Sequence, residues 1–432
     1  MVTHTPRRML LLASAGLAIG LALTGTGLGQ DPVKLVYYFP NSPSNVASAE
    51  SIIKGFEAAN PGITIEIETR PNDDSGDNML KTRLATGEMP DVFLYNTGSL
   101  FKAINPEQTL LDVTDEPWQA NVLDSFKSTV EVGGHYYGAP AGTAAGGAVL
   151  YNKKIYEKLG LTVPKTWAEF MANSQKIKDA GLPAVIQAFG TSWTAQLFVL
   201  ADFYNVITAE PNFPADYTAN KVKYATDPAA LKGFQRQEDV FKAGFLNPDY
   251  ASAVFDDAIR MVALGEGAHF PMLSFSFADI ATTYPDKLND VGFFAMPGDD
   301  AAKNGVTVWM PGGVYISKTT QHPEEAKKFL AYFASVAGCE AQTGANTPTG
   351  PYVVKGCTLP DSVPDGVKDL LPYFQEDGRT APALEFLSPV KGPLMPQITV
   401  EVGSGVMSAV DGAALYDEDV KKQAQQLGLA GW

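Results

Sequence analysis

The chain has 432 residues, of which 45% are hydrophobic and 19% are charged, a composition typical of globular proteins. Its formal net charge is −16, and such an acidic surface argues against nucleic acid or an anionic lipid membrane as a partner. A chain of this length predicts two or three domain units, each with a substantial core.

The first 30 residues have the pattern of a secretory signal peptide. Arg7 and Arg8 form a positive start, residues 9–23 are largely apolar, and the following residues are small and polar. The apolar run is shorter than the ~20 residues that a membrane-spanning helix needs, so we expect cleavage between Ala22 and Asp31. The pattern leaves open whether export uses the Sec or the twin-arginine route. Because this segment has no cysteine for lipid attachment, we expect the mature protein to be free in the periplasm.

Alternating strands and helices are predicted directly after this signal. Residues 33–39 are almost continuously apolar, which suits a central parallel strand covered on both faces. Residues 63–68 alternate in polarity like a half-exposed strand, and residues 92–95 read as another buried strand. Helices are predicted between them, at 49–56 and 80–86. This β-α-β-α-β order predicts an α/β fold with a mostly parallel sheet flanked by helices.

The rest of the chain continues this mixture of elements. Strands are predicted at 182–187, 268–273, 291–295 and 314–316. Helices are predicted at 173–180, at 227–242, at 255–264, from Pro323 onward, and over most of 397–427. Residues 338–396 read as loop-rich, because many Pro and Gly residues interrupt them.

Cys339 and Cys357 are the two cysteines of the chain and lie 18 positions apart. In an exported protein we expect such a pair to form a disulfide. Closing a loop of this length contributes about 3 kcal/mol on the chain-entropy estimate. No histidine lies near either cysteine in sequence, so a metal or catalytic role is the less favoured interpretation.

The familiar catalytic motifs are absent from the sequence, including the G-x-S-x-G elbow, H-E-x-x-H and the P-loop. His269 lies in a predicted strand, where we expect a satisfied core residue rather than a catalytic base. The acidic run at 72–77 lacks the spacing of an EF-hand calcium site, so we expect a solvated loop. Paired carboxylates of a glycoside hydrolase stay possible, because they can be far apart in sequence. The sequence otherwise predicts no enzyme activity, no metal site and no cofactor.

Aromatic residues stand where predicted strands pass into loops. They are Tyr95, Trp193, Phe275 and Trp309. A saccharide offers apolar ring faces that flat aromatic side chains cover, and hydroxyl groups that Asn, Asp and Gln side chains bind. In open α/β sheets ligands bind beyond the carboxyl ends of strands. These residues are therefore candidate ligand contacts, although core packing explains each one alone about equally well.

Five stretches of the chain together resemble family 1 of the bacterial extracellular solute-binding proteins, the sugar-binding proteins of ABC transporters. They are FEAANPGI (56–63), LATGEMPDV (84–92), the small-residue run and PKTWAEF helix start within 137–170, PGG (311–313) and HPEEAKKFL (322–330). Each stretch alone is weak, and their order along nearly the whole chain carries the resemblance. The chain departs from the maltose-binding branch, whose acidic residues are missing at 41–45 and 96–99, so maltose itself is not expected.

The resemblance implies a type II, maltose-binding-protein-like fold with two α/β lobes, each with a mostly parallel sheet, which close on the ligand by hinge motion. After the signal peptide (1–30), the N-terminal lobe is expected to comprise 31–142 and 313–375, and the C-terminal lobe 143–312 and 376–432. The resemblance places a lobe crossing at 137–147. The ligand contacts that it implies by position are Asn41, Ser42, Asn45, Tyr95, Asn96, Thr97, Trp193, Phe275, Trp309, Gly312, Gly313, Asn346 and Arg379.

The implied function is that of a monomeric periplasmic receptor, which binds a mono- or oligosaccharide and delivers it to the permease of an ABC importer. Two alternatives stay open. The same fold could bind a polyamine, ferric iron, a phosphate ester or a peptide, and the tyrosine pairs at 37–38 and 136–137 would be candidate iron ligands. A secreted enzyme that acts on glycans is the second alternative. The sequence does not specify which sugar is bound.

Overall fold

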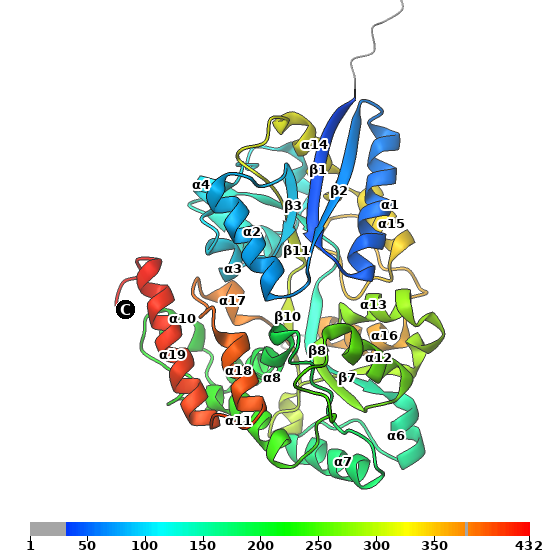
Figure 1. Ribbon diagram of the computed structural model, residues 1–432, viewed down its shortest axis with the longest axis vertical. Helices are drawn as coiled ribbons and strands as arrows, with labels where there is room; N and C mark the ends of the chain where they lie inside the picture. The colour runs from blue at the N-terminus through cyan, green and yellow to red at the C-terminus, as the bar shows by residue number, and fades with distance from the viewer. Residues whose placement is uncertain (1–31, 376–378) are drawn as a thin grey trace, which may run out of the picture. The chain divides into compact units, whose positions relative to one another are not determined.

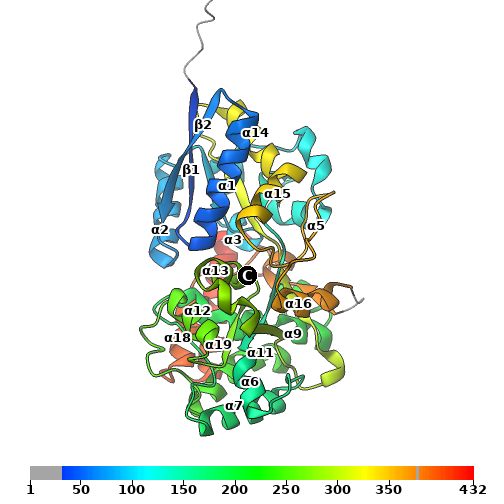
Figure 2. The same ribbon diagram turned by 90° about the vertical axis from the view of Figure 1, so that its right-hand side faces the viewer.

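The computed structural model describes residues 32–375 and 379–432, and Pro32–Trp432 forms one compact unit. This unit has two α/β lobes, each built on a five-stranded sheet (Figures 1 and 2). The predicted signal peptide lies outside the described residues. Within the described ranges, no helix is both long enough and apolar enough to cross a membrane.

The sheet of the first lobe has the strand order β2-β1-β3-β11-β6. Its strands are β1 (Val33–Pro40), β2 (Ile63–Arg70), β3 (Val92–Tyr95), β6 (Gly138–Ala141) and β11 (Gly312–Ile316). Strand β1 is parallel to both β2 and β3, which confirms the predicted central strand. Strand β11 is antiparallel to β3 and β6. A separate two-stranded sheet pairs β4 (Glu131–Val132) with β5 (His135–Tyr136).

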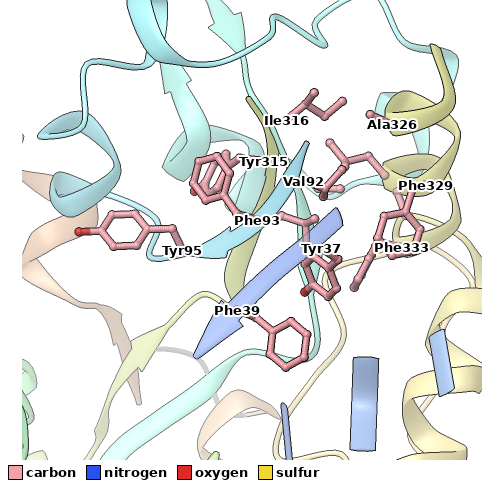
Figure 3. Packing of buried hydrophobic residues seen from close by; sticks show 14 of the residues in the cluster. Tyr37, Phe39, Val92, Phe93, Tyr95, Tyr315, Ile316, Ala326, Phe329 and Phe333 are labelled. Atoms are coloured by element: carbon pink, nitrogen blue, oxygen red, sulfur yellow. The ribbon is translucent and has the colours of Figure 1, made fainter. Parts of the chain in front are cut away.

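Helices cover both faces of the first sheet. They are α1 (Pro43–Ala59), α2 (Asp74–Thr86), α3 (Ser99–Lys102), α4 (Pro106–Thr109), α5 (Asp124–Lys127), α14 (Pro323–Phe333) and α15 (Val336–Ala345). Tyr37 of β1 packs against Phe329 and Phe333 of α14, with ring centroids 5.5 and 5.9 Å away (Figure 3). Its neighbour Tyr38 points to the opposite face, where the guanidinium of Arg83 from α2 lies 4.8 Å from the ring centroid. Because successive side chains of β1 point to opposite faces of the sheet, this one apolar strand packs against a layer of helices on each side.

The sheet of the second lobe has the order β12-β10-β7-β8, and β9 also pairs with β7. Its strands are β7 (Ala145–Asn152), β8 (His269–Leu273), β9 (Val291–Ala295), β10 (Val306–Trp309) and β12 (Thr380–Pro382). Strand β7 is antiparallel to β8, β9 and β10, whereas β12 is parallel to β10. Each sheet thus has one reversed strand, β11 or β7, so the expected parallel direction holds for the other strands. The reversal arises because β7 and β11 lead the chain away from the junction of the lobes, while the other strands run toward it.

The second lobe carries most of the helices. They are α6 (Lys153–Leu159), α7 (Trp167–Asp179), α8 (Leu197–Leu200), α9 (Phe203–Ala209), α10 (Phe213–Thr218), α11 (Pro228–Lys242), α12 (Phe255–Leu264), α13 (Ser276–Thr283), α16 (Asp365–Gln375), α17 (Leu384–Leu387), α18 (Met395–Gly403) and α19 (Ala409–Gln426). Helices α9, α10, α11, α18 and α19 share a hydrophobic cluster of their own, at the lower left of Figure 1. Phe234 and Tyr416 lie in this cluster, which attaches the C-terminal helices to the second lobe.

The strand predicted at 182–187 is wrong. Only Val185 of this segment forms bridges, and they are isolated ones. Pro183 has no N–H to continue a ladder, and the N–H of Gln187 donates instead to the side chain of Asn247 (2.8 Å). A side-chain hydrogen bond thus replaces the strand partner that the sequence pattern predicts.

The acidic run at 72–77 is not a solvated loop but the start of α2. The carboxylate of Asp73 caps the helix by accepting from the N–H groups of Ser75 (2.9 Å) and Gly76 (3.1 Å). A Cβ atom on Gly76 would lie 1.9 Å from the carbonyl oxygen of Pro71, so the turn requires glycine there. Acidic side chains in a first turn also interact favourably with the helix dipole. Helix α2 therefore begins at Asp74, earlier than predicted.

The region predicted as loop-rich contains helix α16. Val367 and Leu370 of this helix are buried in the core of the second lobe, beside Phe293 of β9. Pro372 lies inside the helix and masks its periodicity in the sequence. The predicted disulfide is confirmed, since Cys339 of α15 is bonded to Cys357.

His269 is a fully buried core residue, as predicted. It lies in β8, and its Nε2 is 2.7 Å from the hydroxyl oxygen of Tyr156. Burial lowers the pKa of His269 to about 3, because the interior disfavours the charged imidazolium.

This shift predicts a loss of stability in acid. Below pH 6.5 the unfolded chain binds a proton at His269 that the folded protein does not, so the free energy of unfolding should fall by about 3 kcal/mol between pH 7 and pH 4 from this residue alone. The His269→Gln protein should lack this part of the pH dependence in urea denaturation. If the free energy of unfolding changed equally with pH in the two proteins, His269 would not be the source of this acid sensitivity.

Candidate ligand-binding site between the lobes

Two pairs of consecutive strands connect the lobes. The chain leaves the first sheet after Ala141 in β6 and enters the second at Ala145 in β7, and it returns from Trp309 in β10 to Gly312 in β11. Gly312 pairs with Ala141, and Trp309 pairs with Ala145. The connections therefore form one antiparallel ribbon, β6–β7 beside β10–β11, that continues from one sheet into the other. We call it the connecting ribbon.

A third segment runs beside the connecting ribbon. The N–H of Ala144 donates to the carbonyl of Pro351 (2.8 Å). Ser274 joins the strands here, because its hydroxyl donates to the carbonyl of Thr349 (2.8 Å) and accepts from the N–H of Gly146 (3.0 Å). Hydrogen bonds thus hold the backbone together where the chain passes between the sheets.

The small residues of this crossing make room for the side chains of the protein itself. A Cβ atom on Gly147 would lie 2.3 Å from Cζ3 of Trp309, and one on Gly146 would lie 2.5 Å from Cδ1 of Leu370. Gly142 has φ of +101°, a conformation that favours glycine. The glycines therefore serve packing and a turn at the crossing.

On one side of the ribbon the lobes touch through helices α1 and α13. The N–H of Ser44 in α1 donates to the carboxylate of Asp279 in α13 (3.2 Å). Asn346 joins the same group, because its Nδ2 donates to the carbonyl of Ser44 (2.6 Å). We call this group the α1–α13 contact. It places Asn346, which the sequence proposed as a ligand contact, beside the loop of Asn41–Asn45.

On the other side the lobes touch through the start of α2. The carboxylate oxygen Oδ2 of Asp74 accepts from the hydroxyl of Ser192 (2.5 Å) and from Nε2 of Gln397 in α18 (3.1 Å). Nε1 of Trp193 donates to the carbonyl oxygen of Asn72 (3.3 Å). We call this group the α2 contact.

Two sets of candidate ligand contacts, one on each lobe, adjoin these contacts along the chain, and we call them the two walls. On the second lobe, the half-buried rings of Trp193 and Phe275 have centroids 6.1 Å apart, and Trp193 also packs on Phe255. On the first lobe, Asn41 is exposed at the end of β1, whereas Ser42 is buried and its hydroxyl caps α1. This arrangement combines an aromatic surface with polar groups at strand ends and a helix start.

The loop after β3 is turned mainly into the first lobe. Tyr95 is buried, and its hydroxyl donates to Asp77 (3.3 Å). The hydroxyl of buried Thr97 donates to the carbonyl of Pro311 (3.3 Å). Asn96 is exposed, and its carbonyl accepts from the hydroxyl of Tyr315 (2.9 Å). Of this loop, the side chain of Asn96 is therefore the accessible one.

The remaining first-lobe candidates have structural contacts of their own. Nδ2 of Asn45 donates to the carbonyl of Pro40 (3.0 Å), which fixes the loop after β1. Gly312 and Gly313 lie in β11, where Gly313 pairs with Tyr95. Asn45 thus shapes the loop after β1, and the two glycines belong to the connecting ribbon itself.

Trp309 is the last residue of β10 in the connecting ribbon, and it is largely buried. It packs with Ala145 and Ala383, and its indole N–H donates to the carboxylate of Glu385. That carboxylate also accepts from Nζ of Lys391 (3.3 Å), and both of these charged side chains are about 90% buried. The structure therefore places Trp309 as a packing residue of the hinge region more than as an exposed ring.

Arg379 is not brought together with the other candidates. Its Nε donates to the carbonyl of Asn304 (3.1 Å), and its guanidinium lies over the ring of Tyr373 (4.4 Å). It precedes β12 beside Val306, at the opposite end of β10 from Trp309 and roughly 10 Å away along the strand. Its role in the site stays a prediction that these neighbours do not support.

Residues 40–338 match the profile of the bacterial extracellular solute-binding proteins. The chain belongs to this family. Among similar proteins, the "Multiple sugar-binding protein" of Streptococcus mutans is 28% identical over 331 residues, which cover 74% of this chain and 75% of that protein. The "Melibiose/raffinose/stachyose-binding protein MelE" of Bacillus subtilis is 23% identical over 338 residues, 74% of each chain.

Solved structures support the fold of this solute-binding protein. A structure described as "SBP RafE in complex with raffinose" aligns with a TM-score of 0.75 and 22% identity, over 90% of this chain and 100% of that one. A "Chitin oligosaccharide binding protein" aligns with a TM-score of 0.78 and 21% identity, over 92% and 100% of the two chains. The predicted two-lobed α/β fold is confirmed. The family and these neighbours are binding proteins rather than enzymes.

Sequence reasoning missed the polar residues that join the lobes, chiefly Asp74, Ser192, Asp279 and Gln397. A signal existed for Asp74, since it stands in an acidic run behind a capping residue. No local signal marks Asp279, because its partner Ser44 is 235 positions away. In the described ranges, no group of three or more His, Cys, Asp or Glu side chains is arranged to hold a metal ion.

Asp279 should make closure of this solute-binding protein depend on pH. Burial raises the pKa of its carboxyl group to about 6, although hydrogen bonds from Ser44 oppose the shift. We expect opening of the lobes to return the group to water and to lower its pKa again, so that protonation between pH 6 and pH 4 favours the closed form.

We therefore expect the Asp279→Asn protein to be more closed than the wild type at pH 7.5, with an apparent ligand affinity higher by about 10-fold. Small-angle X-ray scattering at pH 5 and pH 7.5 gives the measurement. The radius of gyration should change less with pH in the variant, and an unchanged pH response would refute the role of Asp279.

Proposed function

We propose that this protein is the exported receptor of an ABC importer and that it binds a saccharide between its lobes. The observation that carries the proposal is the half-buried pair of rings Trp193 and Phe275 on the second lobe, of which Trp193 is hydrogen-bonded to Asn72 of the first lobe. Flat rings match the apolar faces of a sugar, while amide, hydroxyl and helix N–H groups match its hydroxyls. The names of the relatives, which describe sugar-binding proteins, support the same class of ligand.

We propose separate roles for the candidate residues. Asn41 and Asn96 bind hydroxyl groups from the first lobe, buried Ser42 holds the start of α1 beside them, and Trp193 and Phe275 cover a sugar ring from the second. The supporting residues Asn45, Tyr95, Thr97, Gly312, Gly313 and Asn346 shape the loops around them, and Trp309 packs behind the site.

We also propose lobe boundaries that follow the two sheets. The first lobe comprises 32–142 and 312 to about 357, and the second comprises 143–311 and the remainder. This division assigns α16 to the second lobe, because Val367 and Leu370 are buried there. Closure about the connecting ribbon would create the surface that a permease recognises. Export by a cleaved signal, freedom from a lipid anchor, and a monomeric state are parts of the same proposal.

Isothermal titration of the purified mature protein tests the ligand class. The panel should contain raffinose, melibiose, stachyose, a chitin oligosaccharide, galactose and a xylan oligosaccharide, with a polyamine, ferric iron and a phosphate ester beside them. We expect binding heat with at least one saccharide and none with the non-sugar compounds. Heat with a non-sugar compound alone would overturn the saccharide assignment.

Replacing Trp193 should test the aromatic wall. Trp193→Ala removes a ring that would cover the sugar, so we expect affinity for the best saccharide of the panel to fall about 10-fold or more. Trp309→Ala should lower affinity too, but together with stability, because it leaves a cavity beside Gly147. Trp432→Ala is the matched control, since Trp432 packs against the helical cluster of the second lobe. Unchanged affinity in the Trp193 and Trp309 variants would mean that the site lies elsewhere.

A further inference from the structure

The α2 contact has an unusual distribution of hydrogen-bonding groups. The second lobe supplies the donors, which are the hydroxyl of Ser192, the indole N–H of Trp193 and the amide of Gln397. The first lobe supplies the acceptors, which are the carboxylate of Asp74 and the carbonyl of Asn72. One residue of this set, Trp193, is also the ring proposed to cover the ligand.

The acceptor side is held rigidly by the first lobe. Asp74 is the first residue of α2, directly after the capping residue Asp73. The turn into the helix is tight, since a Cβ atom on Gly76 would lie 1.9 Å from the backbone oxygen of Pro71. The carboxylate of Asp74 therefore has a fixed position relative to Asn72 and to the end of β2.

The donor side is assembled by the second lobe alone. Ser192 and Trp193 belong to a short 3-10 turn, Ser192–Gln196, which packs against α18. The amide of Gln237 ties this turn to α11 by donating to the carbonyl of Ala195 (3.0 Å). Gln397 reaches the same carboxylate oxygen as Ser192 from α18, and α2 lies above α18 in both views (Figures 1 and 2). Ser192 and Gln397 thus donate to a single carboxylate of the first lobe, and the indole N–H of Trp193 donates to the carbonyl of Asn72 beside it.

We propose that Asp74 is a positioning residue that couples lobe closure to the orientation of Trp193. The inference rests on the proposed function, in which Trp193 contacts the sugar. When the lobes close, the carboxylate of Asp74 accepts a hydrogen bond from Ser192. The indole N–H of the next residue, Trp193, then donates to the carbonyl of Asn72. Together these bonds hold the indole ring in its packed orientation against Phe255 and Phe275. When the lobes open, the ring loses its partner on the first lobe.

The main test compares Asp74→Ala, Ser192→Ala and the double variant by titration with raffinose, or with the saccharide of the panel that binds the wild type best. Each single variant should bind about 10-fold more weakly, because each removes a hydrogen bond to a charged group. The double variant should be no weaker than Asp74→Ala, since the loss of the carboxylate already removes the partner of Ser192, and of Gln397 as well. Additive losses, or unchanged affinity in Asp74→Ala, would overturn the proposal.

Two further readouts separate positioning from simple structural support. Asp74→Asn keeps an oxygen that can accept from Ser192, so it should recover most of the affinity that Asp74→Ala loses. The change in tryptophan fluorescence on adding the sugar should be smaller in Asp74→Ala than in the wild type. Ser75→Ala is the matched control, because Ser75 lies in the same helical turn and its hydroxyl bonds to Asp73 within the first lobe. It should leave affinity and fluorescence unchanged, and a similar effect from Ser75→Ala would reduce Asp74 to a helix-stabilising residue.

Scattering of the protein without sugar distinguishes failure of this inference from failure of the proposed function. Asp74→Ala should be more open than the wild type and should have a larger radius of gyration. The urea concentration at the midpoint of unfolding should change by no more than the loss of one charge at a helix start explains. If no saccharide binds the wild type, the proposed function fails while this measurement still tests the contact. An identical radius of gyration in the two proteins would refute coupling to closure.

Discussion

The connecting ribbon is the constraint on which the rest of the molecule depends. Strands β6 and β7 run beside β10 and β11, so the two lobes share a pair of hydrogen-bonded strands instead of a flexible linker. Such a ribbon resists sliding, because its ladder fixes the register, but it can bend and twist where pairing is interrupted between Ala141 and Ala145. The permitted motion is therefore a rotation that opens or closes the surfaces at the strand ends.

The ribbon also explains the composition of the crossing. Gly147 must be glycine because the indole of Trp309 occupies the place of its side chain, and Trp309 is in turn held by Glu385. A large buried ring thus lies directly against the strand about which the lobes move. The small-residue run that identifies the family in the sequence consequently serves packing and conformation, whereas the sugar is proposed to lie against residues outside it.

Much of the fold could be predicted because its signals are local. The apolar run of β1 indicated a central strand, and the PKTWAEF stretch marked the start of α7, which Thr166 and Glu169 cap in the structure. The failures occurred where a distant partner decides the outcome. The backbone N–H of Gln187 donates to the side chain of Asn247, 60 positions away, instead of to a neighbouring strand. The sequence pattern of 182–187 does not indicate this hydrogen bond. The candidate site shows the same difference between local and distant signals. Trp193 could be suggested from its own loop, whereas Asp279 and Gln397 could not, because their partners lie in the opposite lobe.

The two contacts beside the ribbon suggest why such a receptor can respond to its ligand. Each consists of a few hydrogen bonds between groups that water can also satisfy, so the net gain on closure is modest for each bond, about 1 kcal/mol. The α1–α13 contact is weaker still near neutral pH, because it buries a carboxyl group whose pKa is raised to about 6. Closing contacts of this kind leave the open and closed forms close in free energy. In the proposed function a sugar touches both walls only in the closed form, and its interaction energy can then decide the population. Stronger contacts across the lobes would close the protein without ligand and remove the difference that a permease must recognise.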